Sequence, residues 1–406
     1  MNGEIYVIVG AGQAGGSAAV AMRRTGFAGR ILLIGDEPHR PYERPPLSKA
    51  VLSAPTLPAP AFLHAADRYG ELAIELMLGT RVRELDVAAC RVVLDDGRSI
   101  AFDRLLLATG GRARRLGLPG AEHVLVLRTL DDALALRTQL AAARRVVCIG
   151  AGVIGLEVAA TARGLGCRVT VLEAAAAPMG RSLCPAGRAL VRSLHEEHGV
   201  ELRFGTTIEA IERLADGTRV VCCADGDRIV ADCVVAGIGM QPNTQLAAQA
   251  GLAVDGGVHV DAHGRTSEPG VYAAGDVAAF LHPRYERRIR LESWQHAQNH
   301  AIHVARIMCG ETAPYEEIPW FWTDQFDVNL QVAGFPGKAE RTVIREGAGR
   351  LTAFHLGRDG QLVGITAADN PGDMRAGLAL MRSGTPVNAA DLADTALPLR
   401  RLVMRR

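Results

Sequence analysis

Lysine is nearly absent from this chain of 406 residues, which contains only Lys49 and Lys338 although arginine is abundant. A strong net charge is also absent, because 45 basic and 44 acidic residues leave a formal net charge of +1. This balance gives no overall reason to expect nucleic acid or a membrane surface as a partner. No run of about 18 apolar residues occurs, so we expect no transmembrane helix and no membrane association.

Paired cysteines are missing as well. The eight cysteines are scattered, and none forms a C-x-x-C pair or a zinc-ligand spacing, so we predict no metal site. Scattered cysteines in a chain of this length are typical of reduced core residues and favour a cytoplasmic location. The apolar N-terminus does not resemble a signal peptide, since glycines at 10, 12, 15 and 16 interrupt it.

One glycine-rich pattern occurs twice in the chain. In the first copy, the apolar run 4–9 leads into the motif 10–15, an alanine-rich stretch and the apolar run 31–34. In the second copy, the run 146–149 leads into the motif 150–155, a helical stretch over 156–163 and the run 169–172. Each copy predicts a strand, a helix and a second strand parallel to the first. The two together indicate a duplicated nucleotide-binding architecture.

The glycines of the two motifs have distinct expected uses. The first permits a tight turn, the second lets the backbone approach a pyrophosphate, and the third lets the helix pack close to the strand. These positions are Gly10, Gly12 and Gly15, and Gly150, Gly152 and Gly155. Asp36 and Glu173 follow at about the 20-residue spacing of a ribose-binding acid. The pattern therefore predicts two dinucleotide sites, and the alternative is a pair of glycine-rich turns without a ligand.

Glu173 bears on the choice of nicotinamide cofactor. A carboxylate accepts a hydrogen bond from the 2′-hydroxyl of NADH and repels the 2′-phosphate of NADPH, so NADH is predicted. Arg181 complicates the choice between NADH and NADPH. It is either a contact to the adenosine end of the cofactor or a surface residue.

Two further segments resemble the glutathione-reductase-like flavoproteins. The pair Gly275-Asp276 after an apolar run resembles their second FAD motif, in which the aspartate holds the ribityl chain. The segment 105–110, which ends in Ala108-Thr109-Gly110, resembles their crossover motif. This resemblance assigns FAD to the first glycine motif and NADH to the second. The alternative for Asp276 is an ordinary helix cap.

The remaining motifs narrow the resemblance. Disulfide reductases of this fold carry a cysteine pair beside the flavin, whereas this chain has Arg44-Pro45-Pro46-Leu47-Ser48-Lys49. That segment, together with 155–157, 291–299 and Pro-Trp-Phe-Trp-Thr-Asp-Gln at 319–325, resembles the FAD-dependent ferredoxin reductases of the putidaredoxin reductase and biphenyl dioxygenase ferredoxin reductase family. The resemblance covers essentially the whole chain.

This resemblance implies the activity. We expect an NADH-dependent FAD flavoprotein that passes electrons one at a time to a [2Fe-2S] ferredoxin, which serves a Rieske oxygenase or a cytochrome P450. FAD and NADH are the implied cofactors, and a monomer or weak homodimer is the implied state. A local run of arginines at 284, 287, 288 and 290 is either a ferredoxin docking face or a solvated surface.

The resemblance also implies which residues contact each cofactor. The implied FAD contacts are Gly10, Gly12, Ala14, Gly15, Asp36, Arg44, Lys49, Val82, Ala108, Thr109, Gly110, Arg128, Gly275, Asp276, Glu292 and Trp294. The implied NADH contacts are Gly150, Gly152, Ile154, Gly155, Glu173, Arg181 and Gly239.

Four residues are implied to act where hydride arrives: Lys49, Glu157, Trp294 and Trp322. Lys49 and Glu157 are expected to form an ion pair near the flavin N5, which limits the cost of burying the lysine. A solvated loop lysine is the alternative for Lys49. The two tryptophans are expected at the flavin edge, or alternatively in the core of a domain junction.

The predicted fold is α/β, with two doubly wound dinucleotide-binding domains and a smaller C-terminal α/β domain. We place the FAD domain at 1–112 and 243–320, the NADH domain at 113–242 and the C-terminal domain at 321–406. Three rivals stay open: a rubredoxin reductase or NADH oxidase, an NADH-sensing protein of the apoptosis-inducing-factor type, and a flavin-free binding module.

Overall fold

A computed structural model describes residues 3–347 and 350–404, and divides the chain into two compact units. The first unit contains residues 1–45, 59–112 and 240–317, and the second contains 46–58, 113–239 and 318–406. The outermost residues of the predicted domains, 1–2 and 405–406, lie outside the described residues. The motif 46–49 thus belongs to the second unit, while the division into three predicted domains stays a prediction.

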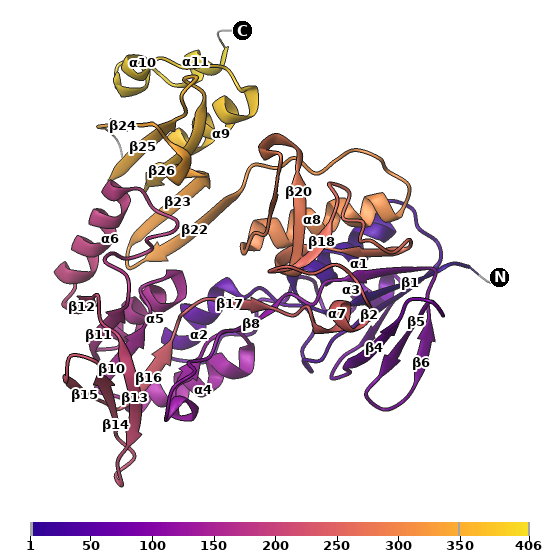
Figure 1. Ribbon diagram of the computed structural model, residues 1–406, viewed down its shortest axis with the longest axis horizontal. Coiled ribbons are helices and arrows are strands. Elements are labelled where there is room, and N and C mark those ends of the chain that lie inside the picture. The colour runs from indigo at the N-terminus through magenta and orange to yellow at the C-terminus, as the bar shows by residue number, and fades with distance from the viewer. Residues whose placement is uncertain (1–2, 348–349, 405–406) are drawn as a thin grey trace. The chain divides into compact units, whose positions relative to one another are not determined.

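The first unit is built on a parallel five-stranded sheet in the order β19-β7-β1-β2-β3. Strands β1 and β2 of this sheet are labelled in Figure 1. Most of its strands are apolar because both faces of the sheet are covered, whereas the edge strand β3 carries the exposed Glu75. The strands are β1 (Ile5–Val9), β2 (Arg30–Ile34), β3 (Ile74–Met77), β7 (Arg104–Leu107) and β19 (Val271–Ala273). Helix α1 (Gln13–Arg24) packs along α8 (Trp294–Met308), and both contribute to one core with β1, β2 and β7.

Smaller elements complete the first unit. An antiparallel sheet contains β4 (Val82–Asp86), β5 (Arg91–Leu94) and β6 (Ser99–Ala101), and a mixed sheet contains β18 (Val258–Val260), β20 (Ala278–His282) and β21 (Arg287–Ile289). Short helices are α3 (Arg68–Glu71) and α7 (Gln245–Gln249), with 3-10 turns η3 (Gly275–Val277) and η4 (Pro283–Tyr285). Strands β8 (Gly111–Ala113) and β17 (Met240–Pro242) lie where the chain passes between units.

The second unit repeats the architecture with a parallel sheet in the order β12-β11-β10-β16-β9. Its strands are β9 (Leu125–Val126), β10 (Arg145–Ile149), β11 (Arg168–Glu173), β12 (Val200–Phe204) and β16 (Cys233–Ala236). Its helices are α2 (Ala50–Ser53), α4 (Leu130–Ala142), α5 (Val153–Gly164) and α6 (Pro185–Glu197). An antiparallel sheet of β13 (Ile208–Arg213), β14 (Arg219–Cys223) and β15 (Arg228–Ala231) adjoins them.

The C-terminal part of the second unit is an antiparallel sheet in the order β22-β23-β26-β25-β24. Its elements are β22 (Trp320–Gln325), β23 (Val328–Gly334), β24 (Arg341–Arg345), β25 (Leu351–Leu356), β26 (Leu362–Ala368), α9 (Pro371–Ser383), α10 (Ala389–Ala393) and α11 (Arg400–Met404). The strand β22 contacts α5, so the C-terminal sheet reaches the helix that carries Glu157.

The sheets confirm the predicted α/β class. Within residues 3–347 and 350–404, no helix is long and apolar enough to cross a bilayer. All eight cysteines are free, and five of them are buried as predicted, but Cys90 is exposed on the surface. The expectation of a core position was wrong for Cys90 because it lies in the turn that joins β4 to β5.

Candidate functional sites

The two glycine turns have the same construction. A side chain at Gly10 would clash with the carbonyl oxygen of Ala108, and one at Gly15 would clash with the carbonyl oxygen of Gly10. By contrast, a Cβ at Gly12 would meet only Arg44 Nη2, at 3.9 Å. The first and third glycines are therefore required by packing, while the second borders open space, as a pyrophosphate site requires.

The second turn repeats this division. A Cβ at Gly150 would lie 2.7 Å from the carbonyl oxygen of Gly237, and one at Gly155 would clash with Gly150. A Cβ at Gly152 would meet only the Gly237 oxygen, at 3.6 Å. The middle glycine of each motif is thus the one that packing leaves free for a ligand.

The helix that follows each turn has the middle glycine as its N-cap. Helix α1 has Gly12 as its N-cap and α5 has Gly152, and neither cap makes a side-chain hydrogen bond among the described residues. Helices α4 and α8, in contrast, are capped by Thr129 and Ser293. Uncapped N–H groups and the positive end of the helix dipole favour phosphate binding. The residues present therefore fit a dinucleotide pyrophosphate at both turns.

Arg44 borders the open space at Gly12 and is held by an acid that the sequence analysis missed. Its Nη2 donates to Glu37 Oε1 at 2.7 Å, and the Tyr42 hydroxyl donates to Glu37 Oε2 at 2.5 Å. Asp36 itself is exposed at the end of β2. Only the position of Glu37, one residue after the predicted acid, could have indicated its role.

The crossover segment is held by another missed residue, Asn243. The Thr109 hydroxyl donates to the Asn243 carbonyl at 2.8 Å, and Asn243 Nδ2 donates back to the Thr109 carbonyl at 2.9 Å. The Asn243 N–H also donates to the Gly110 carbonyl. These bonds fix the path of the backbone just after β7.

The remaining predicted FAD contacts in the first unit lie on several elements. Ala14 and Asp276 are buried, and a Cβ at Gly275 would lie 2.9 Å from the Cβ of Ala14. Val82 is half-buried at the start of β4, and Trp294 is half-buried at the start of α8. Glu292 is exposed and pairs with Arg290 at 2.7 Å. Of all the predicted FAD contacts, Lys49 and Arg128 belong to the second unit.

Glu173 lies at the end of β11, where its carboxylate accepts the Ala151 N–H at 2.7 Å and the Ala175 N–H at 2.8 Å. It is half-buried beside the second glycine turn. Ile154 is 38 % exposed at the start of α5. Arg181 is exposed, and its Nη2 would lie 3.9 Å from a Cβ at Gly239. The structure thus gathers these predicted NADH contacts around one turn.

The predicted ion pair is present. Lys49 Nζ lies 2.9 Å from Glu157 Oε2 and 3.8 Å from Asp324 Oδ2. Glu157 is 4 % exposed, whereas 27 % of the Lys49 side chain remains exposed. A solvated loop lysine, the alternative reading, is therefore wrong.

Residues of the second unit hold the loop that presents Lys49. The Thr161 hydroxyl, one turn after Glu157 on α5, donates to the Ser48 carbonyl at 2.7 Å. Arg137 of α4 donates to the carbonyls of Val51 and Ala54 at 2.8 and 2.6 Å. Neither residue belongs to a recognisable motif, so the sequence offered no signal for them.

The tryptophans and the arginine run complete the predicted residues. Trp322 stacks on Trp320 with ring centroids 5.5 Å apart, and both are half-buried on β22.

In the arginine run, Arg288 donates to the carbonyls of Val260 and Ala279 at 2.8 and 2.7 Å. Arg288 therefore has a structural use in the β18–β20–β21 sheet.

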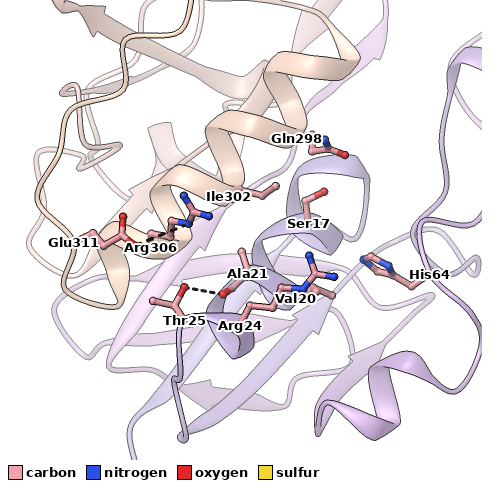
Figure 2. Close-up of a pocket in the computed structure, with 10 residues that line it drawn as sticks. All are labelled: Ser17, Val20, Ala21, Arg24, Thr25, His64, Gln298, Ile302, Arg306 and Glu311. Carbon is pink, nitrogen blue, oxygen red and sulfur yellow. Dashed lines mark hydrogen bonds and ion pairs between the residues drawn. The ribbon is translucent and has the colours of Figure 1, made fainter.

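A cavity of about 410 Å³ lies between α1 and α8 (Figure 2). Its lining includes Arg24, His64 and Arg306. Arg306 Nε lies 4.0 Å from Glu311 Oε1. No predicted site residue lines this cavity. Within the described part of the chain, no group of acidic, histidine and cysteine side chains is suited to hold a metal.

Comparison with known proteins places these sites in context. Residues 5–301 match the family model described as pyridine nucleotide-disulphide oxidoreductase, and residues 320–403 match the reductase C-terminal model. The chain is 41 % identical over 397 residues to the ferredoxin–NAD(+) reductase component of the p-cumate 2,3-dioxygenase system of Pseudomonas putida, with 97 % of each chain covered.

Two solved structures are similar over nearly the full length. One is the ferredoxin reductase for the CYP199A2 system from Rhodopseudomonas palustris, with a TM-score of 0.95, 36 % identity and 98 % and 100 % of the two chains covered. The other is the covalent putidaredoxin reductase–putidaredoxin complex, with a TM-score of 0.93, 37 % identity and 99 % and 98 % covered.

Proposed function

Because the chain belongs to the pyridine nucleotide-disulphide oxidoreductase family, we propose that it is an NADH-dependent ferredoxin reductase. Family membership confirms the resemblance drawn from the motifs, the α/β fold and an oxidoreductase that uses FAD and NADH. The proposed electron acceptor is a [2Fe-2S] ferredoxin that serves a Rieske oxygenase or a cytochrome P450.

The observation that carries the proposal is the Lys49–Glu157 pair at 2.9 Å, in the segment where disulfide reductases carry redox cysteines. Positions 40–53 contain no cysteine, so an internal disulfide cannot take up the electrons there. Electrons must then leave to an acceptor outside the chain. The full-length relatives named as ferredoxin reductases favour a ferredoxin.

When bound, FAD supplies the conversion between NADH, which gives two electrons as hydride, and an acceptor that takes one electron at a time. The chain supplies binding and orientation. The α1 N-terminus and Gly12 would hold the FAD pyrophosphate, and Asp276 would hold the ribityl chain. Gly152 and Glu173 would hold NADH, and Lys49 would place positive charge near the flavin N5. Trp294 and Trp322 would border the flavin.

The test is stopped-flow mixing of the FAD-loaded protein with NADH, followed by excess oxidised [2Fe-2S] ferredoxin. We expect rapid flavin bleaching, slower bleaching with NADPH, and then fast ferredoxin reduction. Bleaching without ferredoxin reduction would favour a rubredoxin or oxygen acceptor, or an NADH sensor. A protein that cannot be loaded with FAD would contradict the proposal.

The cellular setting is also part of the proposal. Eight free cysteines favour a reducing compartment, so we expect the protein in the cytoplasm. We expect a monomer or weak homodimer, which sedimentation at several protein concentrations would test.

A further inference from the structure

Three hydrogen-bond donors meet the buried carboxylate of Glu157, and one comes from the C-terminal strand β22. Ser48 Oγ donates to Oε2 at 2.5 Å, and Lys49 Nζ lies 2.9 Å from the same oxygen. Thr323 Oγ1 donates to the other oxygen, Oε1, at 2.7 Å. Donors to both oxygens match an ionised carboxylate, which can only accept hydrogen bonds.

The hydrogen bonds continue from Thr323 to helix α6. Gln325 Nε2 donates to Thr323 Oγ1 at 2.8 Å, and His195 Nε2 lies 3.0 Å from Gln325 Oε1. Thr323 and Gln325 lie two residues apart on β22, so they point to the same face of the strand. The side chains of Thr323, Gln325 and His195 are all fully buried. A buried chain of four side chains therefore connects α6, β22 and α5.

The direction of each bond in this chain is determined. Thr323 has one hydroxyl proton, and the Glu157 carboxylate can only accept, so Thr323 donates to Glu157. Thr323 must then accept from the amide N–H of Gln325, which turns the Gln325 oxygen toward His195. His195 therefore carries its proton on Nε2. Every donor in the chain points toward Glu157.

The interior around His195 favours the neutral ring. Its Nδ1 has no hydrogen-bond partner among the described residues, and the ring contacts Phe326 with centroids 5.0 Å apart. Burial lowers the pKa of His195 to about 4, the Gln325 hydrogen bond opposes this shift, and the charge of nearby His198 adds to it. His195 is thus a neutral donor across the physiological pH range.

We propose that Thr323, Gln325 and His195 are positioning residues that hold the Glu157 carboxylate in its orientation beside Lys49. The inference rests on the proposed role of the Lys49–Glu157 pair in NADH oxidation. It gives the C-terminal sheet a part in the chemistry, because β22 supplies a hydrogen bond that neither nucleotide-binding sheet provides. Removing this donor takes away a hydrogen bond that orients the Glu157 carboxylate.

The first experiment compares Thr323→Val with Thr366→Val in the FAD-loaded protein. Thr366 is a matched control, since it is fully buried in the same sheet and its hydroxyl is also hydrogen-bonded to a buried side chain, here His355 at 3.1 Å. We expect Thr323→Val to slow flavin bleaching by NADH about tenfold, the size of a lost hydrogen bond to a charged group. The NADH concentration for half-maximal rate should stay unchanged, because the substitution affects the orientation of Glu157 and not the binding of NADH.

A second comparison tests His195 itself. His195→Gln retains a side-chain N–H near the position of Nε2, whereas His195→Leu removes the donor. We expect His195→Leu to slow flavin bleaching, as Thr323→Val does, and His195→Gln to restore the rate. Bleaching rates of Thr323→Val and His195→Leu that match the rate of Thr366→Val would overturn the inference while leaving the proposed function intact.

A third measurement does not depend on activity. Two-bond ¹⁵N–¹H correlation spectra of histidine-labelled protein report the tautomer of each ring, and the spectrum of His195→Gln identifies the His195 signals. We expect a neutral ring with the proton on Nε2 from pH 8 to pH 5.5. A proton on Nδ1, or a charged ring at pH 7, would overturn the inference even in a protein that proved inactive with ferredoxin.

Discussion

Lys49 Nζ lies 2.9 Å from Glu157 Oε2, and the two side chains differ sharply in their access to water: that of Glu157 is 4 % exposed and that of Lys49 is 27 % exposed. The carboxylate therefore depends on its partners for compensation, whereas the ammonium keeps part of its hydration. Removing one partner of such a pair is costly because it leaves the other charge uncompensated.

Lys49→Met should therefore both destabilise the second unit and slow NADH oxidation. We expect a loss of about 3 kcal/mol of unfolding free energy and at least a tenfold slower flavin bleaching. Urea unfolding and stopped-flow absorbance measure the two effects. The double variant Lys49→Met/Glu157→Gln should regain most of the stability but not the rate. Equal recovery of both would contradict a role for Lys49 in catalysis.

Gly12→Ala and Gly152→Ala should weaken one cofactor each. A Cβ at Gly12 meets only Arg44 at 3.9 Å, so the fold tolerates it and any loss reflects the ligand. We expect FAD to bind at least tenfold more weakly in Gly12→Ala and NADH to bind at least tenfold more weakly in Gly152→Ala, because each Cβ occupies the space of a pyrophosphate. Each variant is the control for the other, and fluorescence titration measures both affinities.

Glu173→Gln should narrow the preference for NADH over NADPH. Its half-buried carboxylate repels a 2′-phosphate, and glutamine removes that charge while keeping an acceptor oxygen. We expect the ratio of kcat/KM for the two cofactors to fall about tenfold. Glu201→Gln on the neighbouring strand β12 is the control, and an unchanged ratio in Glu173→Gln would exclude this residue as the discriminator.

Acid should destabilise the first unit through buried histidines of α8. Burial lowers the pKa of His296 to about 3 and that of His300 well below its usual value, and neighbouring histidines add to both shifts. The unfolded state, with histidine pKa values near 6.5, binds more protons, so stability is present above that pH and is lost as the pH falls. Each ring should cost about 1.4 kcal/mol per pH unit below that point.

Thermal unfolding between pH 7.5 and 5 measures this loss. His300→Gln removes one of the two rings, so its unfolding free energy should fall less steeply with acid than that of the wild type. His39→Gln, at a half-buried loop position, is the control for the substitution itself. Parallel slopes for His300→Gln and the wild type would contradict the prediction.

The sequence predicts the nucleotide-binding sheets closely because their signals are local. Strand β1, the turn at Gly10 and the helix α1 follow from adjacent residues, and so do their counterparts around Gly150. The partner of the crossover segment 105–110 could not be predicted, since Thr109 and Gly110 bond to Asn243. Contacts over 134 residues of sequence separation leave no local pattern.

The residues of the candidate site also divide into those with a local sequence signal and those without one. The sequence predicts Lys49 and Glu157 because both lie in short motifs that resemble those of the ferredoxin reductases. Glu37, Thr161 and Arg137 are not found, since their roles depend on which backbone carbonyl or side chain the fold brings near them. The grouping of residues 46–58 with the second unit also depends on tertiary contacts and has no compositional signal.

The position of Thr323 has a consequence for how the protein is made. Thr323 follows Glu157 by 166 residues, so the carboxylate lacks one of its donors while those residues are still being translated. At about 5–20 residues per second, that interval lasts roughly 8–30 s. A ribosome that stalls before β22 would release a chain whose second nucleotide-binding sheet is complete but whose Glu157 has no donor from the C-terminal sheet. In such a product Glu157 would keep the donors Ser48 and Lys49 but would lack Thr323.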